Sequence, residues 1–129
     1  MASNRRAEAS ETNRLTEDQI FSLLSNRRRR DLLRFVESVG GESAVPAITD
    51  HLAQSEYGGA DVSASQRKNV YVSLHQTHLP KLADAGVVEY DEQTKRVALT
   101  DRAVLLLAYC HFDPSSRGGL LSRLFPNGR

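Results

Sequence analysis

The chain has 129 residues and a formal net charge of +1, and 40% of its residues are hydrophobic, 26% charged and 6% aromatic. These values fit one globular domain with a single core, and so few aromatic residues argue against binding single-stranded nucleic acid by base stacking. The one cysteine, Cys110, excludes an intramolecular disulfide. The polar start has no apolar leader, and the longest apolar run, 103–109, is too short for a bilayer. We therefore expect a cytoplasmic protein without a membrane partner.

The sequence divides into an arm, a domain and a tail. Residues 1–14 are polar and without periodicity, which indicates a flexible arm. Periodic patterns begin at Leu15 and continue to about residue 112, which we take as the domain. The segment 113–129 contains Pro114 and two adjacent glycines, so we expect a tail that is flexible or becomes ordered on a partner.

Two helices are predicted at the start of the domain. Thr16 and Gln19 have capping-box spacing and start a helix over 17–24. Ser25 or Asn26 can cap a second helix, whose apolar stripe consists of Leu32, Phe35, Val36 and Val39. The pair Gly40-Gly41 ends this helix, because glycine adopts the left-handed conformation without a Cβ clash.

Two further helices follow, separated by a turn at 55–60. Pro46 suits the first turn of a helix that ends near Gln54. Ser63 or Ser65 opens the longest helical pattern, whose inner side holds Val70 or Tyr71, Leu74, His78 and Leu82. Pro80 removes a backbone donor, so this helix either ends near His78 or kinks and continues to Ala85.

After Gly86 the period changes from helical to alternating. Val88 and Tyr90, then Val97 and Leu99, flank a polar segment, which predicts a hairpin over 87–99. Thr100 is expected to cap a last helix over 101–111, which is apolar almost all round and needs burial in the core or by a second subunit. The predicted fold class is mainly α with a small β-hairpin (α+β). The order of helices and hairpin is that of a winged helix-turn-helix.

The segment His78-Leu79-Pro80-Lys81-Leu82-Ala83-Asp84-Ala85-Gly86-Val87-Val88-Glu89-Tyr90 resembles the end of the recognition helix and the first wing strand of ArsR-type winged-helix regulators. With Val72-Ser73-Leu74-His75 before it, it is more similar to small haloarchaeal winged-helix proteins, mostly uncharacterised and thought to regulate transcription. The resemblance covers roughly residues 16–104. It implies a homodimeric transcriptional regulator that places helix 65–78 in the major groove of DNA and wing 87–99 on backbone or minor groove.

Two sets of site residues follow. Gln, Ser and Thr can read base edges, and Arg and Lys can bind guanine or phosphate. Residues expected to contact double-stranded DNA are Arg67, Lys68, Tyr71, Ser73, Gln76, Thr77, Lys95, Arg96, Arg27 and Arg28. Each could equally be a solvated surface residue, and part of the run Arg27–Arg30 can pair with Asp31 and Glu37. The expected dimer interface consists of Leu105, Leu106, Tyr109, Ile20 and Leu24.

Other kinds of site have less support. His75 and His78, or Cys110-His111 with Asp113, offer metal ligands, but there is no Cys-x-Cys pair, and we predict no metal, cofactor or small-molecule effector. We find no nucleophile elbow or phosphate loop, so we do not expect an enzyme. The competing function is a winged helix that binds a protein partner without DNA.

Overall fold

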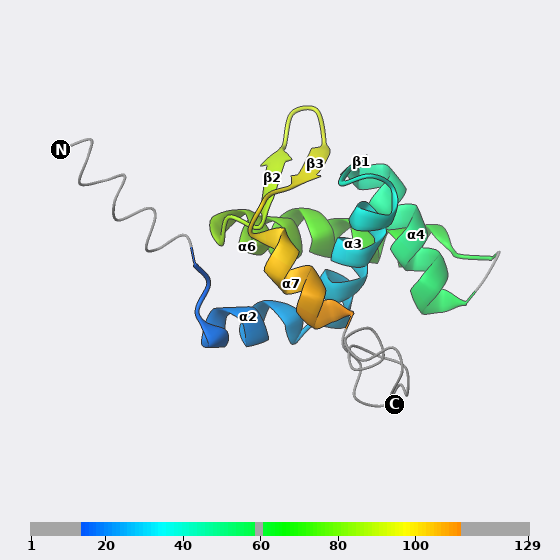
Figure 1. The fold of residues 1–129 in the computed structure, drawn as a ribbon. Coiled ribbons are helices and arrows are strands. Elements are labelled where there is room, and N and C mark those ends of the chain that lie inside the picture. The colour runs from blue at the N-terminus through cyan, green and yellow to red at the C-terminus, as the bar shows by residue number, and fades with distance from the viewer. Residues whose placement is uncertain (1–13, 59–60, 112–129) are drawn as a thin grey trace.

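The computed structural model describes residues 14–58 and 61–111, so the predicted tail and all but the last residue of the predicted arm lie outside the described residues. The elements are α2 (Glu17–Leu24), α3 (Arg27–Ser38), β1 (Glu42–Ala44), α4 (Val45–Tyr57), α5 (Ala64–Ser73), the π-helical turn η1 (Leu74–His78), α6 (Leu79–Asp84), β2 (Val88–Asp91), β3 (Arg96–Leu99) and α7 (Ala103–Cys110) (Figure 1). This part of the chain is mostly helical with one small antiparallel sheet, which confirms the α+β class. None of the helices in it is long and apolar enough to cross a membrane.

The starts of the first two helices follow local hydrogen bonding. The Thr16 hydroxyl accepts from the Gln19 backbone N–H at 3.1 Å, and the Gln19 side chain accepts from the Thr16 N–H at 2.8 Å. This confirms the predicted capping box. Asn26, one of the two candidate caps, accepts from Arg29 N and starts α3. After α3 the chain turns at Gly40, whose φ is +102°, and Val39, placed in the apolar stripe, is instead 49% exposed.

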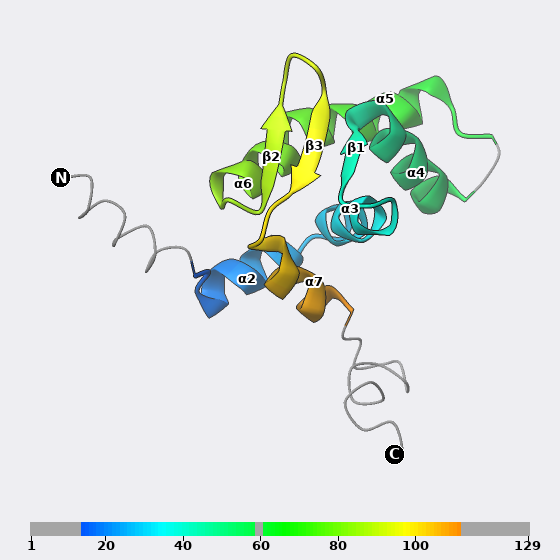
Figure 2. The ribbon, with the colours of Figure 1, turned by 45° about the horizontal axis from the view of Figure 1, so that its top comes forward.

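The sheet has one strand more than the sequence predicts. The hairpin β2–β3 forms as expected, with Val88 opposite Leu99. β1 adds to the free edge of β3, with Glu42 opposite Ala98, so the order is β1-β3-β2. A strand of three residues is too short to give a clear alternation of apolar and polar side chains. The loop between β2 and β3 projects beyond the helices (Figure 2).

The helix-turn-helix segment differs in its boundaries. α4 continues through Tyr57 and ends at Gly58, which has φ +73°, so the predicted turn at 55–60 begins three residues too early. Ser63 starts α5 with a second capping box, formed with Gln66. α5, η1 and α6 then follow without a break, and the chain stays helical through Pro80. Of the two alternatives for Pro80, the helix continues.

The core lies between these helices and the inner face of the sheet. Leu74, Leu79 and Leu82 are each fully buried, which confirms that this side of the long helix faces the core. α2 and α7 lie side by side at the end opposite the hairpin loop (Figures 1 and 2). Thr100 does not cap α7, because its hydroxyl donates to the Gly86 carbonyl at 2.5 Å.

Candidate nucleic-acid interface

The long helix α5–η1 presents one polar row to solvent. Lys68, Gln76 and Thr77, all predicted contacts, are exposed, and so are Ser65 and Asn69, which the sequence analysis did not select. Ser65 and Asn69 share the helical spacing of Lys68, so the position of the core stripe could have identified them. We call Ser65, Lys68, Asn69, Gln76 and Thr77 the polar row. No Asp or Glu occurs between Val62 and Ala83.

The other predicted contacts on this helix are engaged within the protein. Arg67 is exposed, but its Nε lies 2.6 Å from a carboxylate oxygen of Asp50 on α4. Tyr71 is half-buried against the core. Ser73 is half-buried and accepts a 2.7 Å hydrogen bond from Arg28. Tyr71 and Ser73 therefore lie beside the polar row rather than in it.

The run Arg27–Arg30 has mostly structural partners. Arg28 forms a two-pronged pair with Glu56, at 2.6 and 2.8 Å, and this hydrogen bonding raises the pKa of its guanidinium. Arg30 donates to the Leu24 carbonyl at 2.6 Å. Arg27 has a side chain that is 70% exposed, 3.6 Å from Asp31. Within the run, Arg27 alone presents its head group mainly to solvent, and Arg28 joins α3 to α4 and α5.

Arg29 stabilises the end of α2. It is 6% exposed, and its guanidinium donates to the Leu23 and Ser22 carbonyls at 2.7 and 2.9 Å. The last carbonyls of a helix have no partner within that helix, so Arg29 supplies two of the missing donors. The same guanidinium lies 3.2 Å from Nδ1 of His78. An arginine only donates, so Nδ1 accepts and His78 is neutral. Burial, then the charges of Arg29 and Arg28, lower the pKa of His78 to about 4.

An aromatic cluster joins the long helix to the hairpin. Nδ1 of His75 lies 2.8 Å from the Tyr90 hydroxyl. The rings of Tyr71 and His75 are stacked at 6.1 Å, and Tyr90 meets His75 edge to face. Burial raises the pKa of Tyr90, with a contribution from Glu92. The cluster fixes where the hairpin stands relative to the polar row.

The hairpin carries the last two predicted contacts. Lys95 is half-exposed and has φ +60°, and Arg96 follows it at the start of β3. The turn is held by Asp91, whose carboxylate accepts from the Gln93 and Thr94 N–H groups. These bonds, the one from Thr94 first, lower the pKa of Asp91.

Arg96 lies on the outer face of the sheet among acidic residues. Its guanidinium is 3.3 Å from Glu42, and the strand register places it opposite Asp91. Glu89 and Glu42 flank Ala98 on the same face. The outer face of the sheet is therefore more acidic than the helix face that carries the polar row.

The predicted dimer residues separate into two groups. Ile20 and Leu106 are 3% and 0% exposed and belong to the core of the protomer, so they do not form a surface; they faced inward because α2 and α7 pack together. Leu105 and Tyr109 are exposed, and Leu24 is half-buried. The exposed apolar side chains of α2 and α7 are Phe21, Val104, Leu105 and Tyr109, which we call the α2–α7 face. Phe21 and Tyr109 meet edge to face at 6.2 Å.

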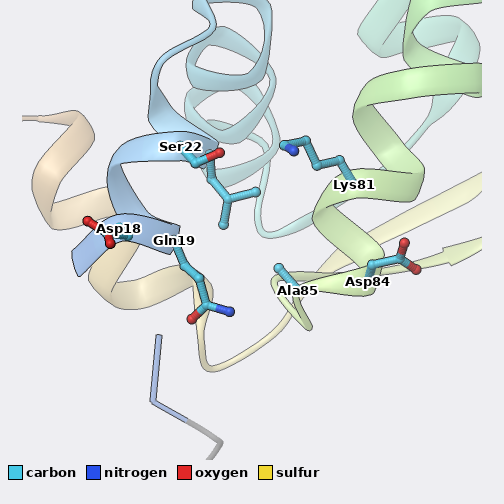
Figure 3. A pocket seen from close by; sticks show the side chains of 7 residues that line it. Asp18, Gln19, Ser22, Lys81, Asp84 and Ala85 are labelled. Carbon is cyan, nitrogen blue, oxygen red and sulfur yellow. The ribbon is translucent and has the colours of Figure 1, made fainter. Parts of the chain in front are cut away.

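A hollow of about 420 Å³ lies between α2 and α6, lined by Asp18, Gln19, Ser22, Leu23, Lys81, Asp84 and Ala85. In Figure 3 the Lys81 side chain extends from α6 toward α2. All three charged residues that line it are exposed, so the hollow lacks the desolvated polar groups that fix a small ligand. Among the described residues no three His, Cys, Asp or Glu side chains are placed to hold a metal ion.

The comparison with protein families gives one match. Residues 21–98, more than half of the chain, match the model of a family described as Domain of unknown function (DUF7344). The chain belongs to this family. The DUF7344 region begins within α2, ends in β3, and includes the polar row and the aromatic cluster. A search of curated proteins and a search of solved structures each found no match.

Proposed function

We propose that this protein is a winged-helix homodimer that binds double-stranded DNA and regulates transcription, without catalysis. The polar row would enter the major groove, and the hairpin would act as the wing. The observation that carries the proposal is the polar row itself: it is exposed, carries Lys68, and lies on a stretch without acidic residues between Val62 and Ala83. A helix of this kind fits the major groove and meets phosphates without repulsion.

The roles within the surface differ. Lys68 and Lys95 would contact phosphate, and Arg67 could exchange Asp50 for a phosphate, because exposed ion pairs contribute little stability. Gln76 and Thr77 would face base edges. Arg28 is left out of the proposed surface, because Glu56 and Ser73 already hold its guanidinium.

The dimer would form through the α2–α7 face. Four exposed large apolar side chains are gathered there, and such a patch on a small protein marks a contact surface. A two-fold dimer would place two polar rows on half-sites about 34 Å apart, one turn of DNA.

The test is selection of bound sequences from a pool of random duplexes, followed by fluorescence anisotropy with the enriched duplex and a scrambled one. We expect enrichment of a near-palindromic site that binds at least about tenfold more tightly than the scrambled duplex. Failure to enrich or bind any duplex at low salt would contradict DNA binding and favour a protein-binding winged helix.

A further inference from the structure

The π turn η1 contains one residue more than the core needs. The buried residues of the long helix are Val70, Leu74, His78, Leu79 and Leu82, with spacings of 4, 4, 1 and 3. Each step of four residues turns an α-helix about 40° past a full circle, so the stripe would rotate away from the core after Leu74. Removing one residue between Leu74 and His78 gives spacings of 4, 3, 1 and 3, which lie on one side of a regular α-helix.

The extra residue changes which side chains face solvent. In a regular helix Thr77, seven residues after Val70, would lie on the core side. In the structure the backbone N–H of Leu79 bonds to the Leu74 carbonyl, five residues back. This wider turn brings His78 and Leu79 into the core and leaves Gln76 and Thr77 exposed.

Two neighbouring features fix the π turn. Pro80 has no N–H and would clash with the carbonyl four residues before it in a regular helix, which favours a widened turn at this point. On the turn's inner side, His75 bonds to Tyr90 of the hairpin. π turns occur often at functional sites, and this one lies at the end of the polar row nearest the hairpin.

We propose that η1 is the base-reading element of the protein, and that the adjacent pair Gln76–Thr77 selects an A·T base pair. The inference rests on the proposed function. A glutamine amide donates to and accepts from adenine N6 and N7, and a threonine methyl group packs against the thymine methyl. The inserted residue thus gives the helix a pair of reading side chains that a regular helix would not expose together.

The experiment removes the inserted residue while keeping the core. Deletion of Thr77 in a Pro80→Ala background restores the regular spacing without the proline clash, and Pro80→Ala alone is the matched control. Both are measured by circular dichroism, thermal unfolding and anisotropy with the duplex enriched by the wild type and a scrambled duplex. We expect the deletion variant to fold, to lose about 10- to 100-fold in affinity for the enriched duplex, and to keep its affinity for the scrambled one. The control should keep its preference.

Substitutions test the same pair without altering the backbone. Gln76→Ala should abolish the preference for A·T at one position of each half-site, whereas Ser65→Ala, elsewhere in the polar row, should not. If the wild type binds no duplex, the proposed function fails and this inference with it. If the wild type binds selectively and the deletion variant keeps that selectivity, or Gln76→Ala does so where the deletion variant does not fold, the reading role of η1 is refuted and DNA binding stands.

Discussion

The neutral His78 links stability to pH. Its side chain is buried, and Arg29 donates to Nδ1 at 3.2 Å, so a proton on that nitrogen would oppose the arginine and break the bond. Burial and the nearby guanidinium groups lower the pKa from 6.5 in an ordinary histidine to about 4. Between these two values the unfolded chain holds a proton that the folded chain does not.

The sign and size of the effect follow from this difference. The free energy of unfolding falls with decreasing pH wherever the unfolded state binds more protons. The contribution of His78 is therefore complete above about pH 6.5 and is lost progressively as the pH falls toward 4. Since each pKa unit corresponds to about 1.4 kcal/mol, the loss from this one group is at most about 3 kcal/mol.

The assay compares the wild type with His78→Asn, whose amide oxygen can accept from Arg29 but cannot take up a proton. The free energy of unfolding is measured by urea titration at several values between pH 7 and pH 4. We expect the variant to be less stable at pH 7, because it fills less of the core, and the difference to shrink by about 2–3 kcal/mol at pH 4. A difference that does not change with pH would refute the neutral, buried His78.

Three other predictions concern the ion pair, the dimer and the wing. Arg28→Ala should lower the free energy of unfolding by about 2 kcal/mol in urea titrations, because it leaves a half-buried carboxylate unpaired, while Arg27→Ala should change it by less than about 0.5 kcal/mol; equal effects would contradict the assignment. Leu105→Glu should yield monomers by light scattering with an unchanged melting temperature, whereas Leu106→Glu should unfold the protein; a monomeric wild type would remove the dimer. Lys95→Gln should weaken binding to all duplexes alike in anisotropy, and a change in sequence preference would show that the wing reads bases.

Local signals in the sequence predicted most of the fold. The capping boxes at Thr16 and Ser63 need only residues three apart, and the hairpin follows from alternation on both sides of a polar turn. The sequence did not predict β1, because three residues are too few to show a period, and pairing with β3 decides its structure.

The site was less predictable, because its charges are paired over long distances. Arg28 and Glu56 are 28 positions apart, and no spacing rule joins them, so the arginine run looked like a surface for phosphate. Arg29 contacts His78 across 49 positions. The π turn could have been found from the spacing of Leu74, His78 and Leu79, but helical periodicity assumes a constant number of residues per turn.

The central claim is that the polar row binds duplex DNA, and the salt dependence of affinity tests it most directly. Anisotropy with the enriched duplex is measured from about 50 to 200 mM salt for the wild type and for Lys68→Gln. We predict that the logarithm of the association constant falls linearly with the logarithm of salt concentration, and that Lys68→Gln makes the slope shallower by about 0.9, the value for one phosphate contact. Binding that does not depend on salt, or a slope that Lys68→Gln leaves unchanged, would contradict the proposed surface.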